Sequence, residues 1–65
     1  MLTREEKNTR RIENHRKIAE YLEASSRHFM EAARFHEHEI YDRAEQNEMI
    51  AKRYLEHAIA LQKEI

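Results

Sequence analysis

The chain contains neither glycine nor proline among its 65 residues. Glycine supplies the backbone conformations of many tight turns, and proline ends helices, so a chain that lacks both has few ways to interrupt a helix. Alanine, glutamate, lysine, arginine and leucine, which are strong helix formers, are frequent, and valine is absent. The sequence therefore predicts an all-α protein, which we interpret as one domain over residues 1–65.

Apolar and small residues recur with heptad spacing in two stretches, which we call the first and second seams. The first seam, with spacings of 4, 3, 4, 3 and 4, consists of Ile18, Leu22, Ser25, Phe29, Ala32 and His36. The second seam consists of Ile40, Ala44, Asn47, Ala51, Tyr54, Ala58, Leu61 and Ile65. Three successive spacings of four separate the two regular patterns and break the heptad phase. Either one long helix is locally unwound there, or the chain turns back somewhere within residues 36–47.

We favour the second interpretation, a long helical hairpin that forms an antiparallel coiled coil and dimerises into a four-helix bundle. Thr3 and Glu6 form a capping box, so the first helix is predicted to begin beside them, with residues 1–17 exposed and frayed at the start. Asp42 and Glu45 form a second capping box. The alternatives are a single long helix and a three-helix bundle with an additional break at Ser25–Ser26.

Self-association is expected because the chain is short. A domain of this size buries only about 60% of its unfolded surface, and there is no cysteine to form a disulfide. Ala44, Ala51 and Ala58 lie seven residues apart, which lets helix backbones approach closely. A homo-oligomer, with a dimer favoured, follows. Its predicted core consists of Ile18, Leu22, Phe29, Ile40, Ala44, Ala51, Tyr54, Ala58 and Leu61.

Charge is unevenly distributed along the chain. Residues 1–17 carry six Lys/Arg against three Glu, residues 18–50 carry three Arg against eight Asp/Glu, and residues 51–65 carry three Lys/Arg against two Glu. A basic start beside an acidic middle suits antiparallel packing. An alternative function is a nucleic-acid-binding regulator that uses the one basic cluster, formed by Lys7, Arg10, Arg11 and Lys17. Nearby glutamates and the net charge of −1 argue against this alternative.

Five histidines raise the question of a metal site. Bundle metal sites use Glu-x-x-His pairs or histidines four residues apart, and neither pattern occurs here. The weak metal candidates are His36, Glu39, His38 and Asp42, and a metal-binding bundle centred on His36 is the second alternative function. The preferred interpretation of His36 is a histidine at the edge of the core, bonded to a neighbouring helix. No cofactor is expected.

The remaining patterns favour a structural, assembly or protein-interaction role without catalysis. No cysteine, glycine-rich loop or serine nucleophile motif is present. The apolar runs are too short for a secretory signal or a membrane span, so we expect a cytoplasmic protein without a membrane partner. Apolar residues outside the seams, such as Met30 and Phe35, either widen the bundle contact or offer a surface to a heterologous protein partner.

Two partial resemblances are present. Residues 51–61 are similar to the second helix of a tetratricopeptide repeat, but the preceding helix departs from that pattern and one repeat is too short to stand alone. The length and the predicted hairpin also look like the ROP family of small dimeric four-helix bundles. This second resemblance concerns architecture alone and implies no function.

Overall fold

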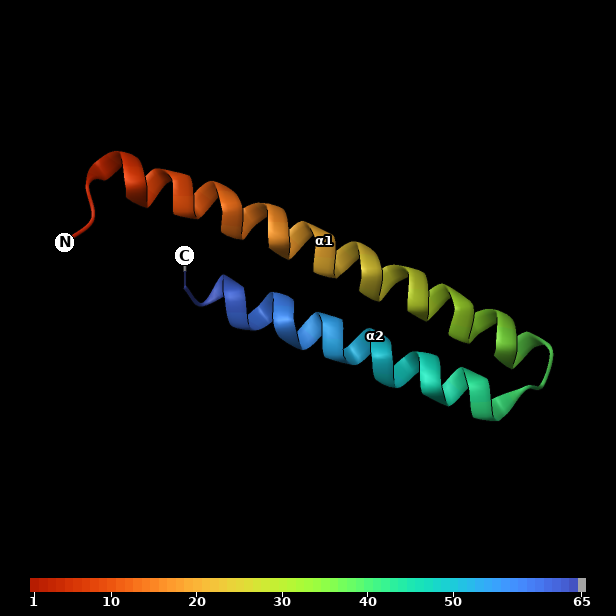
Figure 1. Ribbon diagram of the computed structural model, residues 1–65. Coiled ribbons are helices and arrows are strands. Elements are labelled where there is room, and N and C mark those ends of the chain that lie inside the picture. Colours follow the sequence, from red (N-terminus) through yellow and green to blue (C-terminus); the bar gives the residue numbers. More distant parts are fainter. Residues whose placement is uncertain (65) are drawn as a thin grey trace.

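The computed structural model describes residues 1–64 as two antiparallel helices joined by a short turn (Figure 1). Helix α1 spans Arg4–Glu37, and helix α2 spans Tyr41–Gln62. The hairpin prediction is confirmed, and no strand occurs in these 64 residues. The single-helix and three-helix alternatives are wrong, because the chain reverses once and α1 passes through Ser25–Ser26 without a break. Ile65, the last residue of the second seam, lies outside the described residues.

The turn at residues 38–40 ends α1 with a pattern of hydrogen bonds that glycine usually makes possible. Glu39 has a φ of 58°, the left-handed conformation, and its N–H donates to the carbonyl of His36 at 3.0 Å. The N–H of Ile40 donates to the carbonyl of Phe35 at 2.8 Å. These two bonds form a Schellman motif, which satisfies the last carbonyls of the helix. The turn falls inside the predicted range, and a glutamate takes the position that glycine normally occupies.

The two helices begin in different ways. The hydroxyl of Thr3 accepts a hydrogen bond from the N–H of Glu6 at 3.1 Å, which confirms Thr3 as the cap of α1. The second capping box is wrong. Helix α2 starts from Ile40, which makes no side-chain cap, and the N–H of Ala44 already bonds to the Ile40 carbonyl. The chain therefore enters α2 directly from the turn, two residues before the predicted cap.

Helix α1 has 34 residues and α2 has 22, so the start of α1 extends past the end of α2 (Figure 1). We call residues 4–13 the overhang. The hairpin is a rod about 53 Å long. Within residues 1–64, neither helix contains an apolar stretch of the length and hydropathy needed to cross a membrane.

The core between the helices is made of very small side chains. Its buried residues are Ala24, Ser25, Ala32, Ala44, Ala51 and Ala58. In the described part of the chain no large side chain is fully buried. The alanine stripe of the second seam thus lies directly against α1, as its spacing indicated.

The first seam faces α2 only in part. Ile18 is half-buried and Ser25 and Ala32 are buried, but Leu22, Phe29 and His36 remain exposed, as does Ile40 at the start of the second seam. The expectation that the two seams simply face each other is therefore corrected. Small residues draw the helices together, and the larger residues of the first seam are displaced to the side of the contact.

Candidate interaction surface

Two cross-helix hydrogen bonds set the register of the hairpin. The hydroxyl of Ser25 donates to the backbone carbonyl of Ala51 at 2.8 Å, which requires the backbones to approach closely. Nδ1 of His28 donates to Oδ1 of Asn47 at 2.9 Å, and the Asn47 amide donates to the Arg43 carbonyl. Asn47 therefore lies inside α2 as a polar residue of the seam, and it does not mark the turn.

One side of the hairpin is closed by stacked rings, and we call this side the Tyr–His face. The ring centroids of Tyr21 and His57 lie 5.3 Å apart, and those of His28 and Tyr54 lie 5.7 Å apart. Tyr21 and Tyr54 are also neighbours, at 6.3 Å. These rings come from both helices, so each helix supplies partners for the other.

Sequence reasoning missed the Tyr–His face. Its signal is a third stripe on α1, formed by Tyr21, His28 and Phe35 at intervals of seven residues. The guanidinium of Arg43 lies 6.0 Å from the centre of the Phe35 ring, so this stripe contacts α2 along its length. Phe35 is half-buried against α2, so it widens the helix contact, which is the first of the two interpretations of this residue.

The opposite side of the hairpin is apolar and open, and we call it the apolar face. Leu22, Phe29 and Leu55 each directly follow a residue of the Tyr–His face in the sequence. One residue corresponds to a rotation of about 100° around a helix, so these side chains lie on the other side of the helix contact. Their exposed fractions are 44%, 39% and 36%. Met30 and Ile59, at 59% and 46%, extend the face along α1 and α2. A shallow hollow of about 490 Å³ runs between Leu22, Ser26, Phe29, Met30, Ala33 and Leu55.

The apolar face continues along α1 into the overhang. Ile12, Ala19, Ser26 and Ala33 lie seven residues apart and form one exposed stripe. Ile12 is 44% exposed and lies beyond the end of α2. The face therefore extends over more of the molecule than the contact between α1 and α2.

The metal candidates are not brought together. Nε2 of His36 donates to a carboxylate oxygen of Glu48 at 3.0 Å, and its ring lies 5.9 Å from that of Tyr41. His38 and Glu39 lie in the turn, and Asp42 lies in the first turn of α2. Across residues 1–64, no three His, Cys, Asp or Glu side chains are grouped closely enough to hold a metal ion. His36 is thus a histidine at the edge of the helix contact, bonded to the neighbouring helix.

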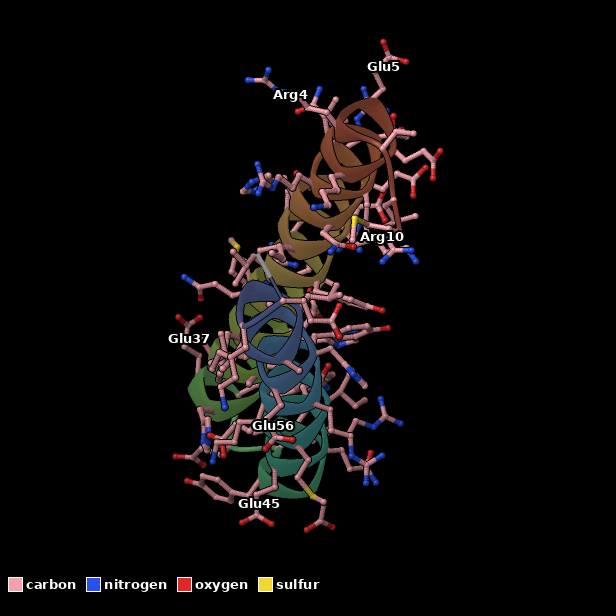
Figure 2. All side chains as sticks on the ribbon, turned by 90° about the vertical axis from the view of Figure 1, so that its left-hand side faces the viewer. Arg4, Glu5, Arg10, Glu37, Glu45 and Glu56 are labelled. Carbon is pink, nitrogen blue, oxygen red and sulfur yellow. The ribbon has the colours of Figure 1, made fainter. Side chains whose placement is uncertain are left out.

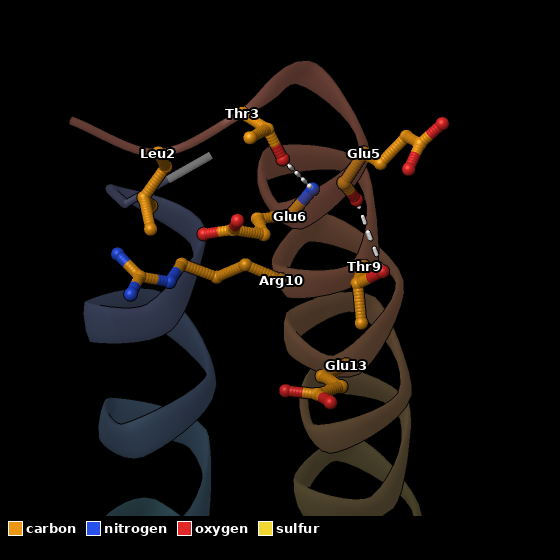
Figure 3. A pocket seen from close by; sticks show the side chains of 7 residues that line it. All are labelled: Leu2, Thr3, Glu5, Glu6, Thr9, Arg10 and Glu13. Atoms are coloured by element: carbon orange, nitrogen blue, oxygen red, sulfur yellow. Dashed lines mark hydrogen bonds between the residues drawn. The ribbon is translucent and has the colours of Figure 1, made fainter.

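The basic cluster lies on and just after the overhang. Lys7, Arg10 and Arg11 line a shallow hollow beside Glu64, and Lys17 lies two turns further along α1. Figure 3 shows Glu5, Glu6 and Glu13 on the same part of the helix as Arg10. The carboxylates therefore divide the basic surface, as the sequence indicated.

No family model, curated protein or solved structure matches this chain. The functional argument therefore depends on the geometry of its own surfaces. Among these surfaces, the apolar face combines several exposed large apolar side chains from both helices.

Proposed function

We propose that the protein is a self-associating helical hairpin with a structural, assembly or protein-interaction role, and that the apolar face is the surface on which a second copy packs. The observation that supports this proposal is the distribution of large apolar side chains. The core holds five alanines and one serine, whereas Leu22, Phe29, Met30, Leu55 and Ile59 are exposed on one side. Because burial of large apolar side chains stabilises a fold most, a second chain is needed to make use of them.

The exposed area supports the same proposal. The chain exposes 5661 Å² for a mass of 8.0 kDa. Compact monomers of this mass expose about 4,450 Å² by the usual scaling of surface with mass. The excess is roughly 1,200 Å², and a standard interface removes about 800 Å² from each partner. A face-to-face pair of hairpins, which is a four-helix bundle, would bring the exposed area per chain close to that of a compact protein.

Closed pairing with an identical chain requires a surface that is complementary to itself. The apolar face meets this requirement because it alternates large residues, Leu22 and Phe29, with small ones, Ala19, Ser26 and Ala33. Large side chains of one copy fit beside small residues of the other. The Tyr–His face has no such alternation and already uses its rings within the chain.

Sedimentation equilibrium tests the proposal over about 1 to 500 μM, which includes the weakest affinities that interfaces of this size show. We expect a dimer of about twice the 8.0 kDa chain mass. Phe29→Glu places a charge in the centre of the apolar face and should yield a monomer. Met49→Glu is the matched control, because Met49 is an equally apolar, 58% exposed residue on the outer side of α2.

Two results would contradict the proposal. One is a wild-type chain that stays monomeric over the whole range, and the other is an equal effect of Phe29→Glu and Met49→Glu. A parallel series with a metal chelator tests the alternative of a bundle held together by a metal ion, which would dissociate when the chelator is added.

A further inference from the structure

We propose that two copies of the hairpin pair head to tail, so that the open end of one lies against the turn end of the other. The open end carries the N-terminus, the overhang and the end of α2, and the turn end carries residues 38–40 (Figure 1). This inference rests on the proposed self-association through the apolar face. It adds which ends meet and what covers the overhang.

The fold turns the charge gradient of the sequence into a gradient along the rod. Residues 1–17 and 51–64 lie together at the open half and carry nine Lys/Arg against five Glu, a net charge of +4. Residues 31–50 form the turn half and carry two Arg against six Asp/Glu, a net charge of −4. In Figure 2 Arg4, Glu5 and Arg10 lie at the open end of the rod, and Glu37 and Glu45 lie on its turn half.

Opposite ends attract only when they belong to different copies. The two ends of one hairpin are separated by most of its 53 Å length, and salt screens charges beyond about 8 Å at physiological ionic strength. Pairing with like ends together would place the two positive halves side by side and the two negative halves side by side. Head-to-tail pairing replaces both repulsions with attractions at interface distance.

The overhang independently favours the same arrangement. In a two-fold, face-to-face pair with like ends together, α1 of one copy packs on α2 of the other. Because α2 is 12 residues shorter than α1, Ile12 would remain uncovered in both copies. In the head-to-tail pair, α1 packs antiparallel on α1 of the second copy, and the overhang meets the end of that helix.

The stripe of Ile12, Ala19, Ser26 and Ala33 fits this antiparallel contact. When the two-fold axis lies midway between Ala19 and Ser26, Ile12 of one copy falls opposite Ala33 of the other, and Ala19 falls opposite Ser26. Every contact then contains a small residue, so the two helices can approach closely. The same register places the positive open half beside the acidic turn half of the second copy.

Spin labels on that stripe test the arrangement. The native chain has no cysteine, so Ile12→Cys, Ala19→Cys, Ser26→Cys and Ala33→Cys each introduce one labelling site. All four positions are exposed in the single chain. Pulsed electron paramagnetic resonance then measures the distance between the two labels of a dimer, and sedimentation confirms that each labelled variant still associates.

Head-to-tail pairing predicts that the distance depends on position. In the dimer labelled at residue 12, and in the dimer labelled at residue 33, the two equivalent labels should be about 30 Å apart or more, from a helical rise of ~1.5 Å per residue. In the dimers labelled at residue 19 or at residue 26, the two labels should be about 20 Å apart or less. Like-end pairing predicts one short distance of below about 20 Å at all four positions, because the copies then run in parallel.

The outcomes separate the two proposals. Short distances at every position would overturn the head-to-tail inference and leave self-association through the apolar face intact. Absence of any dipolar distance, together with a monomeric mass of the unlabelled chain in sedimentation, would overturn both. Long distances at residues 12 and 33 with short ones between them support the inference.

Discussion

The Tyr–His face and the apolar face lie on opposite sides of the same pair of helices, yet they differ in how many contacts their side chains make within the chain. On the Tyr–His face, Tyr21 and His28 of α1 meet Tyr54, His57 and Asn47 of α2 within one molecule. On the apolar face, Leu22 and Phe29 remain exposed.

This difference arises because the residues of the two faces are adjacent in the sequence of each helix. Tyr21 and Leu22 are adjacent in sequence, as are Tyr54 and Leu55, so each pair sends a polar ring to one side and an aliphatic chain to the other. The polar side has directional bonds, which specify the register of two helices. The apolar side offers hydrophobic surface, whose interactions have no preferred direction, and such a surface is suited to association with another chain.

The largest expected effect comes from the alanine core that both faces share. Ala51→Leu should lower the free energy of unfolding by about 2–3 kcal/mol, because the extra volume separates the helices and breaks the bond from Ser25. Urea denaturation at a fixed protein concentration, followed by circular dichroism, measures this loss. Ala60→Leu is the matched control, since Ala60 is exposed on α2 and should tolerate the same change. Equal effects of the two substitutions would mean that the close helix contact is not what holds the hairpin together.

The next effect concerns the apolar face. Leu55→Ala should weaken self-association about 30- to 140-fold, because each dimer loses two buried side chains worth ~1–1.5 kcal/mol apiece. Dilution experiments by analytical ultracentrifugation measure the change. Met49→Ala removes an exposed side chain from outside the face and should leave the dissociation constant within about twofold. A large effect of Met49→Ala would place the interface elsewhere.

A smaller effect is expected on the Tyr–His face. His28→Ala removes the donor to Asn47 and a stacked ring, and should cost about 1–2 kcal/mol of unfolding free energy. Its effect on the dissociation constant of an already folded dimer should be small, which distinguishes this face from the apolar one. His15→Ala provides the control, because His15 is exposed on α1. A variant that dissociates the dimer without lowering hairpin stability would reverse the roles assigned to the two faces.

The smallest effect should come from salt. If opposite ends meet, raising the ionic strength from about 0.05 to 0.5 M should weaken the dimer roughly three- to tenfold, because screening reduces attraction between the ends. Like-end pairing predicts the opposite sign. The double variant Arg10→Gln/Arg11→Gln removes two charges near the open end and should respond less to salt. An unchanged salt response in this variant would mean that the charges of the overhang do not cause the salt effect.

Much of the architecture could be predicted from local features. Thr3 satisfies the first amides of α1 whatever the helix packs against, and the repeated spacing of Ala44, Ala51 and Ala58 marks a contact face on any helix. The break in heptad phase indicated the turn, because a seam cannot continue past a reversal of the chain. The heptad spacing placed the polar residue Asn47 in the second seam, but it did not indicate that His28 is its hydrogen-bond partner.

Other features could not be obtained in this way. The second capping box was a valid local pattern, yet the Schellman turn at Glu39 and Ile40 already started α2 two residues earlier. The sequence also did not indicate which residues of the first seam contact α2 within the hairpin, because heptad spacing does not say which of two adjacent stripes faces the partner helix. Leu22 and Phe29 are more apolar than Tyr21 and His28, but the latter pair faces α2.

The sequence by itself determined that the chain is helical, where its first helix begins, and that one face of its second helix carries a small residue in every heptad. These properties depend on propensities, caps and spacings within a few turns. Only the tertiary structure decided the rotation of α1 about its axis, the pairing of His28 with Asn47, and the overhang that α2 leaves uncovered. These three features depend on how closely the two helix backbones approach each other. Ser25 and Ala51, for example, are hydrogen-bonded although they are 26 residues apart in the sequence, and no local pattern predicts such a contact.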